Sequence, residues 1–135
     1  MKNILILILT LIPFITFAQS DVPEEYWIDD SNFEQKVKGD GFEETDIVVV
    51  EFWAEFNREN CFAEWDQLEV PYYRVNIAEA PLAKKKYRIR MAPTIMIFKE
   101  GYKEVIFKAG LDLLLPTDLQ EINEAIEGIK KEGAY

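Results

Sequence analysis

The chain is poor in sulfur and imidazole groups: its 135 residues include one cysteine, Cys61, and no histidine. A disulfide or a dithiol site needs two sulfurs, so the chain alone can form neither. The lack of histidine also excludes, within one chain, a Cys–His nucleophile pair and a zinc site built from Cys and His ligands. The sequence therefore predicts no metal site and no cofactor.

Positive charge is also scarce, because 15 Lys and Arg residues face 25 Asp and Glu residues and leave a net charge of −10. Binding to phosphate groups needs a positive face, so we expect no nucleic-acid partner. Three acidic stretches lack the alternating oxygen spacing of a calcium-binding loop. They are Glu24-Glu25, Asp29-Asp30 and Glu43-Glu44.

One basic run interrupts this acidic sequence. It comprises Lys84-Lys85-Lys86, Arg88 and Arg90. The simplest interpretation is a solvated helix face, and a docking patch for an acidic partner is the alternative.

A long apolar run occurs only at the N-terminus. Residues 4–17 carry no charge, and the run ends in Thr16-Phe17-Ala18, a pattern typical of a signal-peptidase site. We predict a signal peptide at residues 1–18 and an exported protein, either periplasmic or secreted. The run is shorter than the ~20 apolar residues of a spanning helix, so we expect no stable membrane anchor after cleavage. In such a compartment Cys61 permits a disulfide-linked dimer.

After an acidic lead-in at residues 19–30, with an edge strand at about 26–28, the patterns predict one α/β domain over residues 31–131. Capping boxes are expected at Ser31–Glu34 and at Thr117–Gln120, and an apolar stripe predicts a helix from Asn57 to before Pro71. Strands joined through helices are expected to be parallel, and the final hairpin is expected to be antiparallel. The predicted strands are 47–53, 72–77, 94–98 and 105–107, and the predicted helices are 31–38, 57–70, 81–87 and 117–129. This is a mixed central sheet of four to five strands with helices on both faces.

Two stretches resemble the thioredoxin family. Residues 48–56, VVVEFWAEF, resemble the strand that leads into the family's redox site. Residues 87–101, YRIRMAPTIMIFKEG, resemble its third helix, cis-proline loop and hairpin turn, and Gly110 matches a glycine beside that loop. The resemblance implies a thioredoxin-like fold and a cis peptide bond before Pro93.

The chain departs from the family at the redox motif itself. Asn57 and Asn60 stand where the resemblance places the two cysteines, Arg58-Glu59 replaces Gly-Pro, and Cys61 comes one residue late. The resemblance therefore implies the scaffold without dithiol turnover.

The hypothesis that follows is a chaperone-like or adaptor module that binds protein or extended peptide segments. The resemblance implies a groove beside the cis-proline, where the free backbone of Ala92 would pair with a peptide strand. Its expected residues are Trp53, Phe56, Asn57, Met91, Ala92, Pro93 and Gly110. Three alternatives stay open: monothiol exchange or redox sensing by Cys61 at a helix N-terminus, a structural subunit of an envelope assembly, and a proline that only preserves the fold.

Glu51 interrupts an otherwise apolar strand. An ionised carboxylate in such a strand is costly unless it is paired. The resemblance places Arg74 on the neighbouring strand, so we predict a buried Glu51–Arg74 ion pair with a structural role.

Overall fold

The computed structural model describes residues 22–39 and 46–132. The predicted signal peptide at residues 1–18 and the acidic pair Glu43-Glu44 lie outside the described residues. The elements in chain order are η3 (Glu24–Tyr26), β1 (Trp27–Ile28), α1 (Phe33–Lys38), β2 (Ile47–Trp53), η4 (Glu55–Asn60), η5 (Trp65–Gln67), β3 (Tyr72–Asn76), η6 (Ile77–Glu79), α2 (Pro81–Lys86), β4 (Thr94–Lys99), β5 (Tyr102–Lys108) and α3 (Leu119–Glu132), where η marks a 3₁₀ turn.

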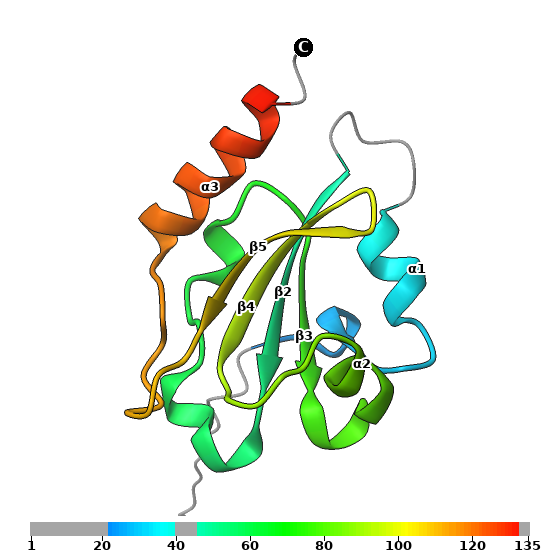
Figure 1. The fold of residues 1–135 in the computed structure, drawn as a ribbon, viewed down its shortest axis with the longest axis vertical. Helices are drawn as coiled ribbons and strands as arrows, with labels where there is room; N and C mark the ends of the chain where they lie inside the picture. Colours follow the sequence, from blue (N-terminus) through cyan, green and yellow to red (C-terminus); the bar gives the residue numbers. More distant parts are fainter. Residues whose placement is uncertain (1–21, 40–45, 133–135) are drawn as a thin grey trace, which may run out of the picture.

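The sheet has five strands in the order β1-β3-β2-β4-β5 (Figure 1). β1 and β2 both run parallel to β3, whereas β4 runs antiparallel to β2 and to β5. The mixed sheet is confirmed, but the expected parallel direction is wrong for β4. The reason is length: α2 has six residues and rises only ~9 Å, too little to carry the chain back along the sheet. β4 therefore starts at the edge where β3 ends.

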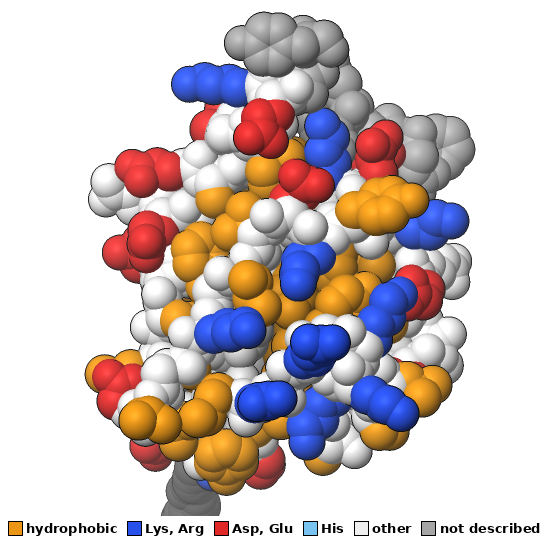
Figure 2. Space-filling view, in the orientation of Figure 1, with side chains coloured by type: hydrophobic (Ala, Val, Ile, Leu, Met, Phe, Trp, Pro, Cys, Tyr) orange, Lys and Arg blue, Asp and Glu red, His pale blue; other side chains and the backbone are white. Residues whose placement is uncertain are grey.

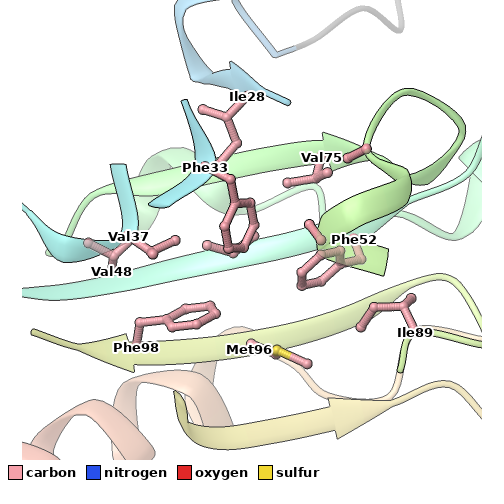
Figure 3. Packing of buried hydrophobic residues seen from close by; sticks show 12 residues of the cluster. Ile28, Phe33, Val37, Val48, Phe52, Val75, Ile89, Met96 and Phe98 are labelled. Atoms are coloured by element: carbon pink, nitrogen blue, oxygen red, sulfur yellow. The ribbon is translucent and has the colours of Figure 1, made fainter. Parts of the chain in front are cut away.

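The hydrophobic core lies on both faces of the sheet, as the nearly continuous apolar run of β2 predicts. Val48, Val50 and Phe52 pack under α1 and α2, while Ile47 and Val49 point to the face covered by α3. Figure 3 shows the first cluster, in which Phe33 of α1 packs among the side chains of the strands. This arrangement places helices on both faces, as predicted.

The helix predicted at residues 117–129 forms as α3, and Ile122, Ile126 and Ile129 on one of its faces are all buried against the sheet. Burial of each such side chain contributes roughly 1.5–3 kcal/mol. The cap differs from the prediction by one residue. The carboxylate of Asp118 accepts the N–H of Glu121 at 2.8 Å, and Thr117 instead donates to the side chain of Glu121 at 3.0 Å.

The capping box predicted at Ser31–Glu34 does not form. α1 begins after Asn32, which makes no side-chain cap, and Ser31 bonds to Asp29 instead. The carboxylate of Asp29 accepts the N–H of Ser31 at 2.9 Å, and the Asn32 side chain accepts the N–H of Asp29 at 2.9 Å. These residues form a turn before α1, which explains why the helix starts later than its sequence pattern indicates.

The predicted helix between Asn57 and Pro71 does not form. The chain makes only the 3₁₀ turns η4 and η5 there, and Asn57 inside η4 has non-helical angles (φ −125°, ψ 28°). The stripe Phe62, Trp65 and Leu68 still packs against the α3 face of the sheet. The apolar spacing therefore predicts correctly which side chains are buried, but the helix that it predicts does not form. Hydrogen bonds from side chains to the backbone of this segment replace the helical ones, as described below.

No helix within residues 22–39 and 46–132 has the length and apolar character needed to span a membrane.

Candidate functional site

Four neighbouring strands meet at one edge of the sheet, which we call the loop end. β2, β3 and β5 finish there and β4 begins there. The register fixes this arrangement, because Thr94 pairs with Phe52 on one side and with Lys108 on the other. The loops at this end are residues 54–61, 87–93 and 109–118 (Figure 1).

The loop before β4 contains a cis peptide bond between Ala92 and Pro93. The hydroxyl of Thr94 donates to the carbonyl oxygen of Met91 at 2.7 Å, which fixes the path of the loop. Ala92 is 1% exposed, Pro93 is buried and Met91 is half-buried. The cis-proline loop therefore offers little open surface of its own.

Asn57 in η4 lies against this loop. Its Nδ2 donates to the carbonyl oxygen of Ala92 at 2.8 Å and to that of Leu113 at 2.7 Å, and its Oδ1 accepts from Nδ2 of Asn60 at 2.7 Å. A primary amide has two N–H donors, so both are used on backbone carbonyl groups. We call these three bonds the Asn57 clasp, because they join η4, the cis-proline loop and the loop after β5.

The loop after β5 is held in a strained shape. Leu113 has φ +58°, a left-handed conformation that costs a non-glycine residue on the order of 1–2 kcal/mol. Its N–H donates to the carbonyl oxygen of Gly110 at 3.0 Å, and the Asp112 carboxylate accepts the N–H of Leu114 at 3.1 Å. Together with the Asn57 clasp on the carbonyl of Leu113, these bonds fix the turn.

One expectation for the groove is corrected by this geometry. The backbone of Ala92 was expected to be free for a peptide strand, but its carbonyl oxygen already accepts the amide of Asn57. Strand addition at that carbonyl would require the clasp to open. Asn57, expected only to line the groove, is the residue that occupies its hydrogen-bonding position.

Apolar side chains are exposed around the clasp. Phe56 is 74% exposed, Leu111 92% and Leu114 54%, and Gly110 is exposed beside them. Trp53, also expected in the groove, is half-buried. Figure 2 shows hydrophobic side chains gathered at the lower left, over the loop after β5 and the region of η4. Leu111 and Leu114 are not among the residues expected in the groove. Their signal in the sequence is a group of leucines after β5 that lacks helical spacing.

The fold of this chain is similar to those of solved thioredoxin structures. A mutant thioredoxin from Halobacterium salinarum superposes with a TM-score of 0.59 and 15% identity over 84% of this chain and 96% of its own. The reduced thioredoxin pre-protein of Schistosoma mansoni matches at 0.59 and 15% over 76% and 95%, and a Malassezia sympodialis thioredoxin at 0.53 and 23% over 76% and 87%. The chain has the thioredoxin fold. No family model and no curated protein matches its sequence.

Within this thioredoxin fold, Asn57 and not Cys61 lies against the cis-proline loop. It follows η4 as the residue that ends the turn, with extended angles (φ −73°, ψ 165°), and it is half-buried. The expected position at a helix N-terminus is wrong, because no helix follows it. Its thiol is one of the groups near the Arg74 guanidinium, whereas the contact with the cis-proline loop is made by Asn57.

The predicted ion pair is the centre of a buried hydrogen-bond network in the thioredoxin fold. Arg74 and Glu51 are paired across β2 and β3, with Nη2 to Oε1 at 3.1 Å and side chains 3% and 0% exposed. The hydroxyl of Tyr72 donates to Glu51 at 2.6 Å and accepts from Nε of Arg74 at 2.9 Å. We call Glu51, Tyr72 and Arg74 the Glu51 network.

The Glu51 network also holds the backbone of the next segment. The N–H of Phe62 donates to Oε2 of Glu51 at 3.0 Å, and the carbonyl oxygen of Phe62 accepts from Nη2 of Arg74 at 3.0 Å. Both polar groups of this buried residue are therefore satisfied by side chains instead of by a helix. This explains how Phe62 is buried against the sheet without helical hydrogen bonds.

Burial dominates the titration of this network. It raises the pKa of the Glu51 carboxyl, against the opposing effects of Arg74 and the hydrogen bonds from Tyr72 and Phe62. Burial and the nearby Glu51 raise the pKa of the Tyr72 hydroxyl well above its ordinary value, so it stays a donor. Burial is the largest single effect on Arg74 and lowers the pKa of its guanidinium, but the nearby Glu51, Tyr72 and Cys61 together outweigh burial and raise that pKa.

The loop end carries no pair of cysteines. In place of two sulfurs it presents the amides of Asn57 and Asn60, which neither exchange disulfides nor act as nucleophiles. Within the part of the chain that the structure describes, no group of three or more Cys, Asp or Glu side chains gathers closely enough to hold a metal ion.

Proposed function

We propose that the protein is a protein-binding module, chaperone-like or adaptor in type, that uses the loop end without thiol chemistry. The observation that carries this proposal is the exposure of Phe56, Leu111 and Leu114 on loops that the Asn57 clasp holds together. Exposed apolar side chains that gather at one place on a domain surface commonly mark a site for another protein.

The clasp supports binding because it fixes the shape of the site in advance. A loop ordered before binding loses less conformational entropy when a partner docks. The backbone of Leu113 is also fixed before binding, because neighbouring hydrogen bonds hold it in its left-handed conformation. The occupant is an extended segment of another protein whose apolar side chains pack against the three exposed residues.

The mode of binding differs from the expected strand addition at Ala92. Since the carbonyl oxygen of Ala92 is engaged by Asn57, contacts between side chains supply the affinity, with the half-buried Trp53 and Met91 at the margin of the site. The proposal places this activity outside the cytoplasm, which rests on the signal-like sequence of residues 1–18 alone.

The test is selection and titration of peptides. Random peptides displayed on phage are selected on the immobilised protein, and the best binder is titrated by fluorescence anisotropy. The triple variant Phe56→Ser/Leu111→Ser/Leu114→Ser should weaken binding by at least ~10-fold, since buried apolar anchors of an interface are each worth more than ~1 kcal/mol.

A matched control removes exposed apolar side chains elsewhere. Leu82 on α2 is 70% exposed and Tyr102 at the β4–β5 turn is 75% exposed. The variant Leu82→Ser/Tyr102→Ser should bind the selected peptide as the unchanged protein does. Equal binding by the loop-end variant, or selection of no peptide at all, contradicts the proposed function.

A further inference from the structure

A group of basic side chains extends from the loop end onto α2. No acidic residue occurs from Pro81 to Lys99, although the whole chain is acidic. Figure 2 shows Lys and Arg side chains gathered in the lower centre, over α2 and the neighbouring strand ends. We call the following residues the basic patch: Lys84, Lys85, Arg88, Arg90 and Lys108.

The positive charges of the basic patch are not neutralised within the described ranges. Lys86, on the same helix, is within 2.6 Å of the Glu34 carboxylate. None of the five basic-patch residues forms a salt bridge with any residue among 22–39 and 46–132. All five are exposed, in a protein whose net charge is −10.

The basic patch is continuous with the loop end. Two shallow hollows share Arg88, Ile89 and Arg90 in their walls. One extends over α2 to Lys84 and Lys85. The other extends past Met91 and Thr94 to Lys108 and Ala109, next to the loop that carries Leu111. A segment lying on the exposed leucines can therefore continue directly onto these cations.

Arg88 occupies a backbone position that usually holds glycine. It has φ +54°. The N–H of Arg88 bonds to the carbonyl of Lys85 at 3.2 Å, and the N–H of Ile89 bonds to that of Lys84 at 2.9 Å, the two bonds of a Schellman helix end. An arginine here gives up stability that a glycine would keep, which favours a role for its charge.

We propose that the basic patch binds carboxylates of the same protein segment that docks on the loop end, so that the partner is both apolar and acidic. This inference rests on the proposed function and names its partner's chemistry. Charge complementarity carries it, because five cations that have no salt-bridge partner among the described residues adjoin an apolar site. A protein segment fits better than nucleic acid, since the net charge of −10 repels a long polyanion.

The probe is a fluorescein-labelled synthetic peptide of alternating leucine and glutamate, and its partner probe carries glutamine at every glutamate. The unchanged protein should bind the glutamate peptide about fivefold more tightly, as expected for a few surface ion pairs, and added salt should remove the difference. The variant Arg88→Gln/Arg90→Gln should bind both peptides alike. Lys103→Gln/Lys131→Gln removes equal charge elsewhere and should keep the preference.

The outcomes separate this inference from the proposed function. Equal binding of both peptides by the unchanged protein overturns the role of the basic patch, while loss of that binding in the Phe56/Leu111/Leu114 serine variant still supports the loop end. Loss in Arg88→Gln/Arg90→Gln alone supports the basic patch and contradicts the loop end. Tighter binding of a short single-stranded RNA or of anionic phospholipid vesicles than of the glutamate peptide contradicts the assigned partner.

Discussion

The Glu51 network and the loop end both hold backbone carbonyl groups by side-chain hydrogen bonds, but they differ in burial and strain. Glu51 and Arg74 are almost wholly inaccessible to solvent, and their partners include both backbone groups of Phe62. At the loop end, by contrast, Leu113 and Arg88 have left-handed backbone conformations and large apolar side chains face solvent.

The difference indicates which region contributes to stability and which gives some of it up. A buried, satisfied network fixes a segment that has no helix of its own, and breaking it leaves a charge unpaired in the interior. Strained and exposed residues lower stability, and proteins commonly accept that loss at sites that bind other molecules. Substitutions in each region test this contrast.

Removal of Arg74 should be the most damaging change. Arg74→Leu leaves the Glu51 carboxylate buried without its cation and the carbonyl of Phe62 without its donor. We expect the free energy of unfolding to fall by ~3–5 kcal/mol, measured by urea denaturation with far-ultraviolet circular dichroism.

The control is an exposed ion pair. Lys86 and Glu34 are in contact, but their side chains are 54% and 63% exposed, so Lys86→Ala should change the free energy of unfolding by less than ~0.5 kcal/mol. A loss of similar size in both variants would mean that burial does not distinguish the two pairs. A loss below about half a kilocalorie in Arg74→Leu would refute the structural role of the Glu51 network.

Removal of the Asn57 clasp should have an intermediate effect. Asn57→Ala deletes three hydrogen bonds, each worth roughly 0.5–1.5 kcal/mol, so we expect a loss of ~2 kcal/mol. Amide hydrogen exchange of residues 110–115 should accelerate as well, because the carbonyl of Leu113 loses its partner.

Two matched variants sharpen this prediction. Asn57→Asp keeps the shape but replaces both donors with acceptors beside two carbonyl oxygens, so it should be at least as destabilising as alanine. Asn60→Ala breaks only one bond of the clasp and should leave the exchange of residues 110–115 nearly unchanged. Unaltered exchange in all three variants would show that the clasp does not order the loop.

The smallest effect should be a gain. Arg88→Gly relieves a left-handed residue at a helix end, so we expect the free energy of unfolding to rise by about 1 kcal/mol. Arg88→Ala removes the same charge and keeps the strain, so it should not stabilise the protein. If alanine stabilised as much as glycine, charge repulsion among the lysines and not backbone strain would be the cause.

The elements that depend on local periodicity were predicted correctly from the sequence. The strands and α3 followed their apolar patterns because both faces of the sheet are covered and because a stripe of isoleucines suits one helix face. The predicted helix over residues 57–70 failed because Glu51 and Arg74, distant in the chain, take the backbone groups of Phe62. No local pattern reveals such competition.

The candidate site was predictable only in part. The resemblance brought Asn57, Ala92 and Pro93 to one place, and the structure puts them there. Their relation was not predictable, since the amide of Asn57 bonds to residues 35 and 56 positions away. The exposure of Leu111 was not predicted either, because a leucine that follows a predicted strand is typically assigned to the core.

The main proposal is that the loop end recognises partners and does not exchange thiols. A useful comparator is Asn57→Cys/Asn60→Cys/Cys61→Ser, because the side chains of Asn57 and Asn60 are 2.7 Å apart between Oδ1 and Nδ2. Cysteines at these two positions should form a disulfide, detected by mass spectrometry before and after reduction.

The decisive measurement is insulin reduction by dithiothreitol, followed as turbidity, with the unchanged protein and Cys61→Ser side by side. We predict that both give the rate of dithiothreitol alone, because the single thiol of Cys61 lies after η4 while Asn57 holds the cis-proline loop. A faster rate for the unchanged protein that disappears in Cys61→Ser would contradict the proposal.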